Sequence, residues 1–397
     1  MTDAAARRCP PRPAAADRDN NRKLVELDAV RGIAALIVFA GHFCEGLAPA
    51  VTGWLNGTLG FAALNGPGAV IVFFVLSGFV LTLRPLQAGS WGPFVRLALT
   101  RWPRLAVPVA LAGLAYWLTA VLHGFPRPEV LGTMLPQHPP AYLFWGQAQH
   151  NEDLGAVLRE ALGGTFLRES AQHNPVLWTM HWEFLGSFLA LALAVSVLLR
   201  LPVTIRGVLF GILSVAAAAY SPWLIAFPVG VLGAALHGAV GTRLRIGNML
   251  AFGMLLCAAA LLSWDIRVQA GLWAWTGALP FQVRFSGWVV TECVAAGLWM
   301  AVALYNPAAR RWLSGPFGSL SGKMSFSFYL VHLLVLCSFS AWLFIPLGAG
   351  RLAAAGLFVV SLAASIVLAA PLMMFDQWWI RVLRFSSSRR LLTSPAQ

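Results

Sequence analysis

The chain has 397 residues, of which 58% are hydrophobic and only 11% are charged, whereas a soluble globular protein is nearer a quarter charged. This composition excludes separate water-soluble domains of normal size and predicts an all-α, polytopic membrane protein. The formal net charge is +13. In a membrane protein such an excess marks the cytoplasmic loops, so we expect no nucleic-acid partner.

Ten apolar runs have about the 20 residues that a helix needs to cross a bilayer. They are roughly residues 29–48, 64–83, 103–123, 176–198, 204–220, 222–239, 247–265, 284–305, 324–346 and 352–376. We expect one ten-helix membrane domain over residues 27–380, with an outer loop region at 124–175. The flanking segments 1–26 and 381–397 are basic; the first has no apolar stretch after its charges, so it predicts a disordered tail and no cleaved signal peptide.

The basic residues predict the orientation of the spans. An even number of spans puts both termini on one side, and of the 28 Lys and Arg residues 21 fall on that side against six on the other, with Arg31 inside the first span. Both termini are therefore expected in the cytoplasm. The five cysteines are scattered and show no ligand spacing, so we expect neither a metal site nor a permanently bound cofactor.

The first span contains two ionisable residues, which are costly in lipid and therefore candidate functional groups. Arg31 lies near the cytoplasmic end and His42 follows eleven residues later. Eleven residues at 100° each return to within about 20° of the starting direction, so both side chains share one helix face about 16 Å apart.

The second and third spans add a serine and several arginines. Ser77 precedes Gly78, and close helix packing at these small residues is a better prediction than a nucleophile. Arg101 and Arg104, three residues apart at the start of the third span, can share a face suited to phosphate oxygens. Anchoring of arginines at lipid headgroups remains an equal alternative for each one.

The fourth span begins outside, which puts Glu183 about 10 Å below the outer surface, at the same depth as His42. Matching depth allows a His42–Glu183 pair in which the carboxylate orients the imidazole as a general base. The alternative, equally weighted, is that Glu183 pairs with a structural arginine and His42 bonds a helix carbonyl. Trp178, at the start of this span, is expected to be an interfacial anchor.

The last two spans contain further polar groups. Tyr329 and His332 lie in the inner half of the ninth span, where His332 is as well explained by a buried core position as by function. Asp376 ends the tenth span and is expected to pair structurally with one of the arginines.

In order and spacing, these motifs resemble the acyltransferase 3 family of integral-membrane O-acyltransferases. The segments that carry the resemblance are LDAVRGIAALIVFAGHF, FFVLSGFVLT, RWPRLAVP, VLWTMHWEF, SFSFYLVH and FDQWW. The resemblance covers residues 27 to about 380. It implies transfer of an acetyl or other short acyl group from acyl-CoA to an extracytoplasmic carbohydrate, and a multi-pass location in a bacterial inner membrane.

The resemblance also implies site residues. The family's essential histidine and arginine fall on His42 and Arg31, its basic pair on Arg101 and Arg104, and its acid on Glu183. The chain departs from the family at Gly186 and Ser187, where many members have an aromatic pair, so the packing partner there is expected to differ. We also expect no appended hydrolase-like domain, which some members carry at the C-terminus.

These expectations combine into one mechanism. The nucleotide phosphates of CoA bind the cytoplasmic arginines, the pantetheine arm extends toward His42, and His42, held by Glu183, deprotonates an acceptor hydroxyl, either for direct transfer or through an acyl-enzyme.

Other partners are the bilayer and a carbohydrate whose identity the sequence does not give; the oligomeric state is likewise open. The alternatives are a carrier that flips a glycan or small solute without chemistry, disfavoured by the absence of evident repeats, and, more weakly, a non-catalytic scaffold.

Overall fold

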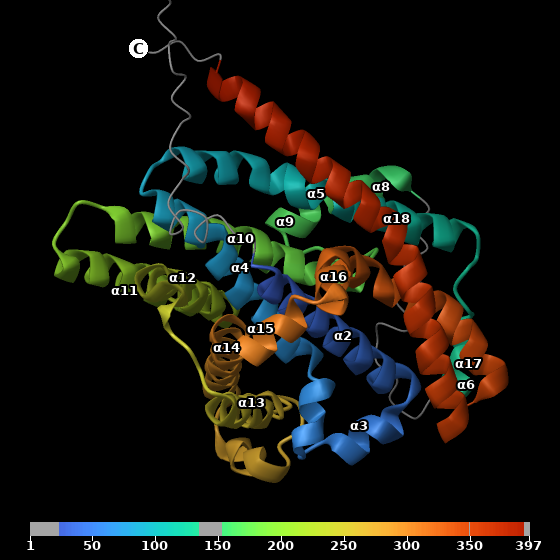
Figure 1. Cartoon of the computed structure of the whole chain (residues 1–397). Helices are drawn as coiled ribbons and strands as arrows, with labels where there is room; N and C mark the ends of the chain where they lie inside the picture. Colours follow the sequence, from blue (N-terminus) through green and yellow to red (C-terminus); the bar gives the residue numbers. More distant parts are fainter. Residues whose placement is uncertain (1–23, 135–152, 349, 393–397) are drawn as a thin grey trace, which may run out of the picture.

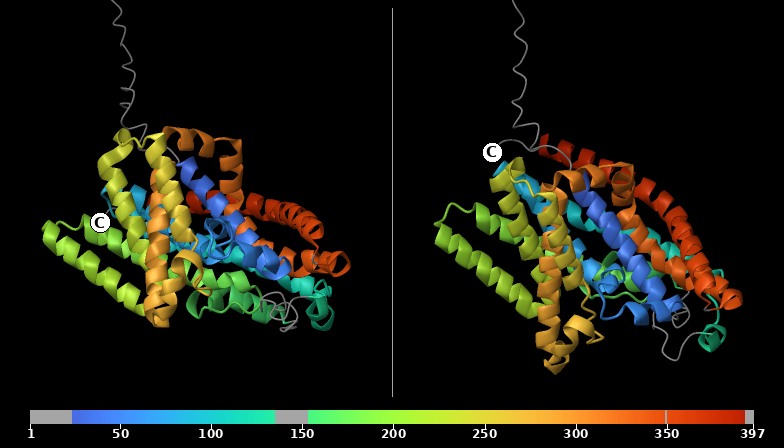
Figure 2. Two further views of the ribbon diagram at one scale, coloured as in Figure 1. Left: turned by 90° about the horizontal axis from the view of Figure 1, so that it is seen from below. Right: turned by 60° about the horizontal axis from the view of Figure 1, so that its bottom comes forward.

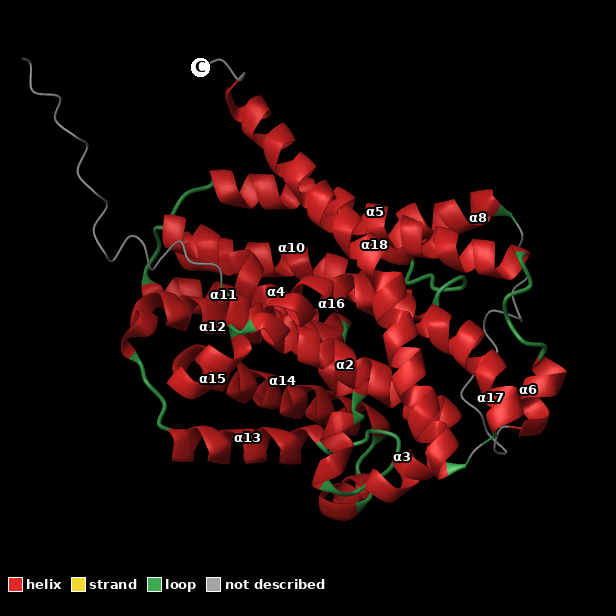
Figure 3. Ribbon diagram, turned by 45° about the vertical axis from the view of Figure 1, so that its right-hand side comes forward, coloured by secondary structure: helices red, strands yellow, loops and turns green. Residues whose placement is uncertain are grey.

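The computed structural model describes residues 24–134, 153–348 and 350–392, and within these ranges the chain is helical with no strand (Figure 3). Nine helical segments of the described chain are long and apolar enough to cross a membrane. They are built on α2 (Val25–Leu47), α4 (Gly66–Ala88), α5 (Gly92–Val121), α10 (Trp178–Leu198), α11 (Val203–Tyr220), α12 (Ala226–Val240), α14 (Phe281–Tyr305), α16 (Pro316–Val335) and α18 (Arg351–Leu392). The all-α, polytopic prediction is confirmed.

Three of the differences from the predicted boundaries are large. The expected span 247–265 becomes α13 (Asn248–Leu262), whose 15 residues are fewer than the roughly 20 of a full crossing. The segment nevertheless leads from the end of the bundle where Ile246 bonds Tyr305 to the end where Arg267 bonds Glu45, so the chain changes sides between α12 and α14 as ten crossings require. Helix α5 begins at Gly92, eleven residues before the predicted start, because Pro103 and Pro108 are accommodated within it. Helix α18 continues to Leu392, so residues 381–392 extend a helix where a tail was expected. Residues 1–23, 135–152 and 393–397 of the predicted tails and outer loop lie outside the described residues.

Short polar residues and glycines set the ends of the spanning helices. The side chain of Asn65 accepts a hydrogen bond from the Gly68 amide and starts α4. Gly89, with φ of 59°, ends the same helix in the left-handed conformation that glycine adopts without strain. Asn174 caps the turn η4 (Pro175–Leu177) that leads into α10. These caps satisfy the backbone groups that a helix end leaves unpaired.

Helix α2 lies at the centre of the bundle between α4 and α16 (Figure 1). A Cβ on Gly32 would lie 2.5 Å from the Ser321 hydroxyl, and one on Gly322 would lie 2.6 Å from the Asp28 backbone, so α2 and α16 approach at glycines. Farther along, His42 of α2 meets His332 of α16, which means that the two helices run in the same direction. This approach positions the site described below.

Helix α4 packs most closely against α12. A Cβ on Gly230 of α12 would lie 2.2 Å from the Val75 carbonyl oxygen, and one on Gly78 would lie 2.6 Å from the Phe227 carbonyl oxygen. The predicted close packing at Gly78 is therefore confirmed. By contrast, α11 lies at the edge of the molecule, and only 6% of its residues are buried, as expected for a helix that faces lipid (Figure 1).

Shorter helices complete the bundle. Helix α13 runs beside α14 (Figure 2) and leads through residues 263–270 to the 3₁₀ segment η7 (Gly271–Ala278). After the C-terminal end of α2 come α3 (Pro49–Leu55) and η1 (Leu59–Ala63). The segment between α5 and α10 contains α6 (Pro128–Met134), α8 (Leu154–Arg159), the π-helical turn η3 (Glu160–Gly164) and α9 (Thr165–Leu167).

The remaining short elements connect the later spans. Helix α12 leads through η6 (Gly241–Arg243) to α13, and α15 (Pro307–Leu313) precedes α16. Helix α16 continues through the π-helical turn η8 (Leu336–Ser340) into α17 (Ala341–Leu347).

Candidate active site

His42 and His332 form a hydrogen-bonded pair between α2 and α16. His42 Nδ1 lies 3.0 Å from His332 Nε2, and His332 Nδ1 lies 2.8 Å from the Tyr329 carbonyl oxygen. The His332 side chain is completely buried against the rings of Phe39 and Phe328. His332 is thus buried, as the core explanation from the sequence expects, and it is also hydrogen-bonded to the candidate base His42.

Glu183 of α10 lies in a separate network with Arg101 of α5 and Ser77 of α4. Arg101 Nη2 and the Ser77 hydroxyl both donate to Glu183 Oε1, and Arg101 Nε donates to the Ser187 hydroxyl over 2.6 Å. The Arg101 and Glu183 side chains are only 12% and 14% exposed. This is a mostly buried ion pair in which both side chains also bond a serine hydroxyl.

The expected His42–Glu183 pair is therefore wrong. Both residues lie in the described part of the chain, and there His42 bonds to His332 while the Glu183 carboxylate bonds to Arg101 and Ser77. Equal depth is fixed by the rise of each helix, but lateral position depends on which helices pack together. Glu183 instead follows the alternative, pairing with an arginine.

The three arginines named from the sequence gather at the end of the bundle where α2 begins. Arg31 acts electrostatically on both Arg101 and Arg104, so the three guanidinium groups lie close together. Each also has a carboxylate neighbour: Asp28 lies 3.6 Å from Arg31, Glu183 bonds Arg101, and Asp376 binds Arg104 through two contacts of 2.6 and 3.2 Å. The structural pairing predicted for Asp376 is confirmed.

The three arginines differ in solvent exposure. Arg31 and Arg104 are 27% and 28% exposed, whereas Arg101 is enclosed by its partners. The guanidinium of Arg104 also lies over the Phe326 ring, 5.2 Å from its centroid. Of the three arginines, Arg31 has the longest contact with its carboxylate partner and is therefore held least tightly by the protein.

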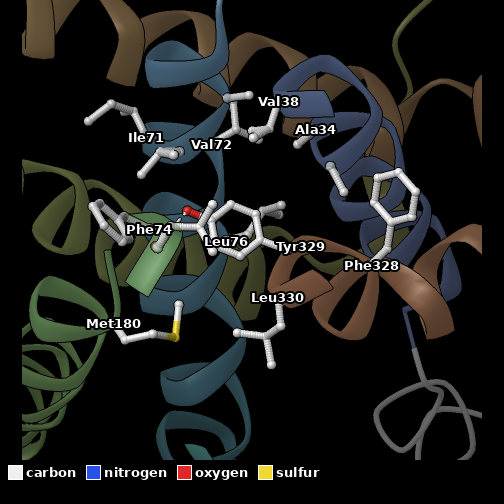
Figure 4. Close-up of a cluster of buried hydrophobic side chains, with 14 of the residues drawn as sticks. Ala34, Val38, Ile71, Val72, Phe74, Leu76, Met180, Phe328, Tyr329 and Leu330 are labelled. Atoms are coloured by element: carbon white, nitrogen blue, oxygen red, sulfur yellow. Dashed lines mark hydrogen bonds between the residues drawn. The ribbon is translucent and has the colours of Figure 1, made fainter. Parts of the chain in front are cut away.

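Tyr329 and Trp178 have packing roles that the structure makes explicit. Tyr329 lies among apolar side chains of α2 and α4 (Figure 4), and its hydroxyl bonds the Thr179 hydroxyl over 2.9 Å. This contact joins α16 to α10 beside the histidine pair. Trp178 begins α10 and packs its ring 5.0 Å from the Trp223 ring.

A charged cluster that was not predicted from the sequence lies at the opposite end of α2 from Arg31. Arg267, in the segment between α13 and η7, contacts Glu45 Oε1 over 2.5 Å and Asp265 Oδ1 over 3.1 Å. Partial burial would lower the pKa of Arg267, but Asp265 and Glu45 more than offset this and raise the pKa above its ordinary value, so the guanidinium stays charged. Arg267 also acts electrostatically on His42, and Glu45 follows His42 by three residues on the same helix face.

A second residue was missed despite an available signal. Glu292 is fully buried in α14, where its Oε1 accepts a hydrogen bond from the Asn65 side chain over 3.0 Å. A glutamate inside a predicted span meets the rule that singled out Glu183. Arg267 offered no such signal, since it lies outside the predicted spans, two residues after the end of 247–265.

Comparison with known proteins identifies the chain. The sequence model of the acyltransferase 3 family, described as an acyltransferase domain, matches residues 24–370. The chain belongs to the acyltransferase 3 family. It is also 25% identical over 214 residues to the O-acetyltransferase PaAT-1 of Phomopsis amygdali, a match that covers 45% of this chain and 42% of the relative, so the chain spans less than half of that protein. No solved structure matches it.

The contacts of Gly186 and Ser187 show what packs against this part of α10. A Cβ on Gly186 would lie 2.0 Å from the Phe227 ring of α12. Ser187 is fully buried and bonds Arg101. Gly186 therefore leaves room for the Phe227 ring, and the neighbouring serine takes part in the Arg101 network.

We expect Gly186→Ala to destabilise the protein by about 1–3 kcal/mol, because the added methyl group overlaps the Phe227 ring. Thermal unfolding of detergent-solubilised protein measures the loss. The control is Gly207→Ala on lipid-facing α11, where no described atom lies within 4 Å of the new Cβ and stability should be unchanged or slightly higher. Equal melting temperatures for Gly186→Ala and wild type would contradict the packing described for Phe227.

Proposed function

We propose that this acyltransferase moves an acetyl or other short acyl group from cytoplasmic acyl-CoA to a hydroxyl of an extracytoplasmic glycan, with His42 as general base. The observation that carries the proposal is the arrangement along α2: Arg31 and its neighbouring arginines at one end, and the His42–His332 pair about 16 Å away on the same face. The name of the PaAT-1 relative, an O-acetyltransferase, supports an acetyl group and an oxygen acceptor.

The donor end is assigned to Arg31 and Arg104. Guanidinium groups form strong, directional hydrogen bonds with phosphate oxygens, and these two retain solvent exposure on the side where the basic residues gather. A phosphate of CoA would replace the 3.6 Å contact between Arg31 and Asp28. Arg101, which shares their expected role in the sequence, supports this end indirectly through its bonds to Glu183 and Ser187.

At the reacting end, the acceptor hydroxyl gives its proton to His42 as its oxygen attacks the thioester carbonyl. The bond between the acyl carbon and sulfur then breaks, and His42 returns the proton to the departing thiolate of CoA. Each transfer keeps the proton on a group positioned by the protein, which avoids a free alkoxide or a free thiolate.

The acceptor is assigned to the side of Glu45, Asp265 and Arg267. Both carboxylates and the guanidinium offer hydrogen bonds to hydroxyl groups, and Arg267 is 48% exposed. With Arg31 facing the cytoplasm, this cluster faces the opposite compartment. In this orientation both termini lie in the cytoplasm. We propose that the membrane is a bacterial inner membrane.

Replacing Arg31 with glutamine is expected to raise the KM for acetyl-CoA by about 10–100-fold, the value of a charge-assisted hydrogen bond, with a smaller change in kcat. Steady-state kinetics in detergent or nanodiscs measure both constants. The matched control is Arg311→Gln, an exposed arginine of α15 on the same side, which should leave the KM unchanged. An unaltered KM in Arg31→Gln would remove Arg31 from the donor site.

The overall proposal is tested with purified protein, radiolabelled acetyl-CoA and candidate glycan acceptors. Release of CoA that depends on the acceptor, with label on the glycan, is the expected result. Movement of intact glycan into proteoliposomes without CoA consumption would instead establish a carrier. If neither response is seen with any acceptor or acyl-CoA donor, both the acyltransferase and the carrier function are contradicted.

A further inference from the structure

The hydrogen bonds around His332 fix which nitrogen of His42 accepts a proton. A carbonyl oxygen only accepts hydrogen bonds, so His332 Nδ1, 2.8 Å from the Tyr329 carbonyl, carries a hydrogen. In a neutral imidazole the other nitrogen then has the lone pair. His332 Nε2 is therefore the acceptor in the 3.0 Å contact, and His42 Nδ1 is the donor.

The opposite assignment would require a charged His332. A doubly protonated His332 would donate to both neighbours, but its side chain is completely buried beside the rings of Phe39 and Phe328. Among the described residues, the titratable and charged groups around the pair are Tyr329 on α16, Glu45 on α2 and Arg267 from the segment after α13. The Glu45 carboxylate bonds Arg267 over 2.5 Å, so its negative charge is balanced outside the pair and does not stabilise a buried imidazolium at His332; the neutral arrangement is favoured.

We propose that His332 is a positioning residue that holds His42 as the Nδ1–H tautomer, so that His42 Nε2 is the atom that takes the proton from the acceptor hydroxyl. This inference rests on the proposed function. When His42 Nε2 receives the proton, its Nδ1–H donates to His332 Nε2 and shares the positive charge with a second ring. His332 thus orients the His42 imidazole, the role that the sequence predicts for Glu183.

The packing of α16 explains how His332 keeps this orientation. The Tyr329 hydroxyl is tied to Thr179 of α10, and the Leu330 carbonyl accepts a 3.0 Å hydrogen bond from the Asn174 side chain. These contacts hold the turn of α16 that ends at His332. Together with the glycine contacts at Gly32 and Gly322, they fix the two histidines relative to each other.

Kinetics of two substitutions test the proposal. His332→Ala removes the acceptor for His42 Nδ1 and is expected to lower kcat at least about 100-fold with little change in the KM for acetyl-CoA. His332→Gln places a carbonyl oxygen near the lost nitrogen and should recover part of kcat, with a shifted dependence of kcat on pH. Equal kcat in wild type and both variants would overturn the proposal, as would loss in the glutamine variant as large as in the alanine variant with folded protein retained.

A measurement that does not depend on turnover separates this inference from the proposed function. In protein labelled with ¹⁵N-histidine, the signal assigned by loss in His42→Gln should show a protonated Nδ1 and an unprotonated Nε2. A protonated Nε2 in the neutral ring would overturn the tautomer assignment even if the enzyme transfers acyl groups. Full activity of a His42 variant would instead overturn the proposed function and leave the tautomer assignment intact. His237→Gln, a histidine of α12 that contacts the Tyr305 hydroxyl over 3.0 Å, is the control and should alter neither the His42 signal nor kcat.

Discussion

Replacing His42 with alanine is expected to reduce acyl transfer by about 10²–10⁴-fold while leaving folded protein in the membrane. The substitution removes the only group proposed to take the acceptor proton, so the hydroxyl must attack the thioester before it is deprotonated. Because His42 is partly buried and donates to His332, alanine also leaves His332 Nε2 without that donor, at a modest cost in stability. The loss should appear in kcat with all acceptors.

The measurement is transfer of labelled acetyl groups per folded protein, with folding checked by size-exclusion chromatography and thermal unfolding. His237→Ala is the matched control, since it removes another histidine of a spanning helix that bonds a neighbouring side chain. It should retain activity. General-base catalysis typically contributes about 10²–10⁴-fold. If His42→Ala kept more than about a tenth of wild-type turnover, the loss would be smaller than this contribution, and His42 would not be the base.

The second large effect concerns the ion pair between Arg101 and Glu183. Glu183→Ala leaves the guanidinium of Arg101 mostly buried without its counter-charge, which typically costs about 3–5 kcal/mol. We expect a severe loss of folded protein or a melting temperature lowered by many degrees. Arg101→Ala should have a similar effect for the opposite charge.

Combining the substitutions distinguishes a buried ion pair from two independent packing defects. The double variant Glu183→Gln with Arg101→Met removes both charges and should be more stable than Glu183→Ala alone. The pair Arg159–Asp153, whose side chains are 74% and 55% exposed, is the control; Arg159→Ala should cost less than about 1 kcal/mol. Additive losses at Arg101 and Glu183 would show that the two charges do not stabilise each other.

Particular residues show how far the sequence alone could predict the site. Arg31 and His42 were placed on one face of one helix, and α2 indeed runs uninterrupted from Val25 to Leu47. The pairing of Asp376 with an arginine was also foreseen. His332 was recognised as an intramembrane histidine, but its contact with His42 was not, because the two residues are 290 positions apart and belong to helices whose contact no periodicity encodes.

The sequence by itself determined the quantities that follow from one helix at a time. Composition and apolar run length gave the all-α membrane fold, and a rise of about 1.5 Å per residue gave the separation of Arg31 and His42. Only the tertiary structure decided the lateral partners: glycines at Gly32 and Gly322 bring α16 against α2, while Gly186 admits Phe227 beside the Arg101 network. Residues at equal depth can lie on opposite sides of a bundle, and for this reason Glu183 pairs with Arg101 while His42 pairs with His332.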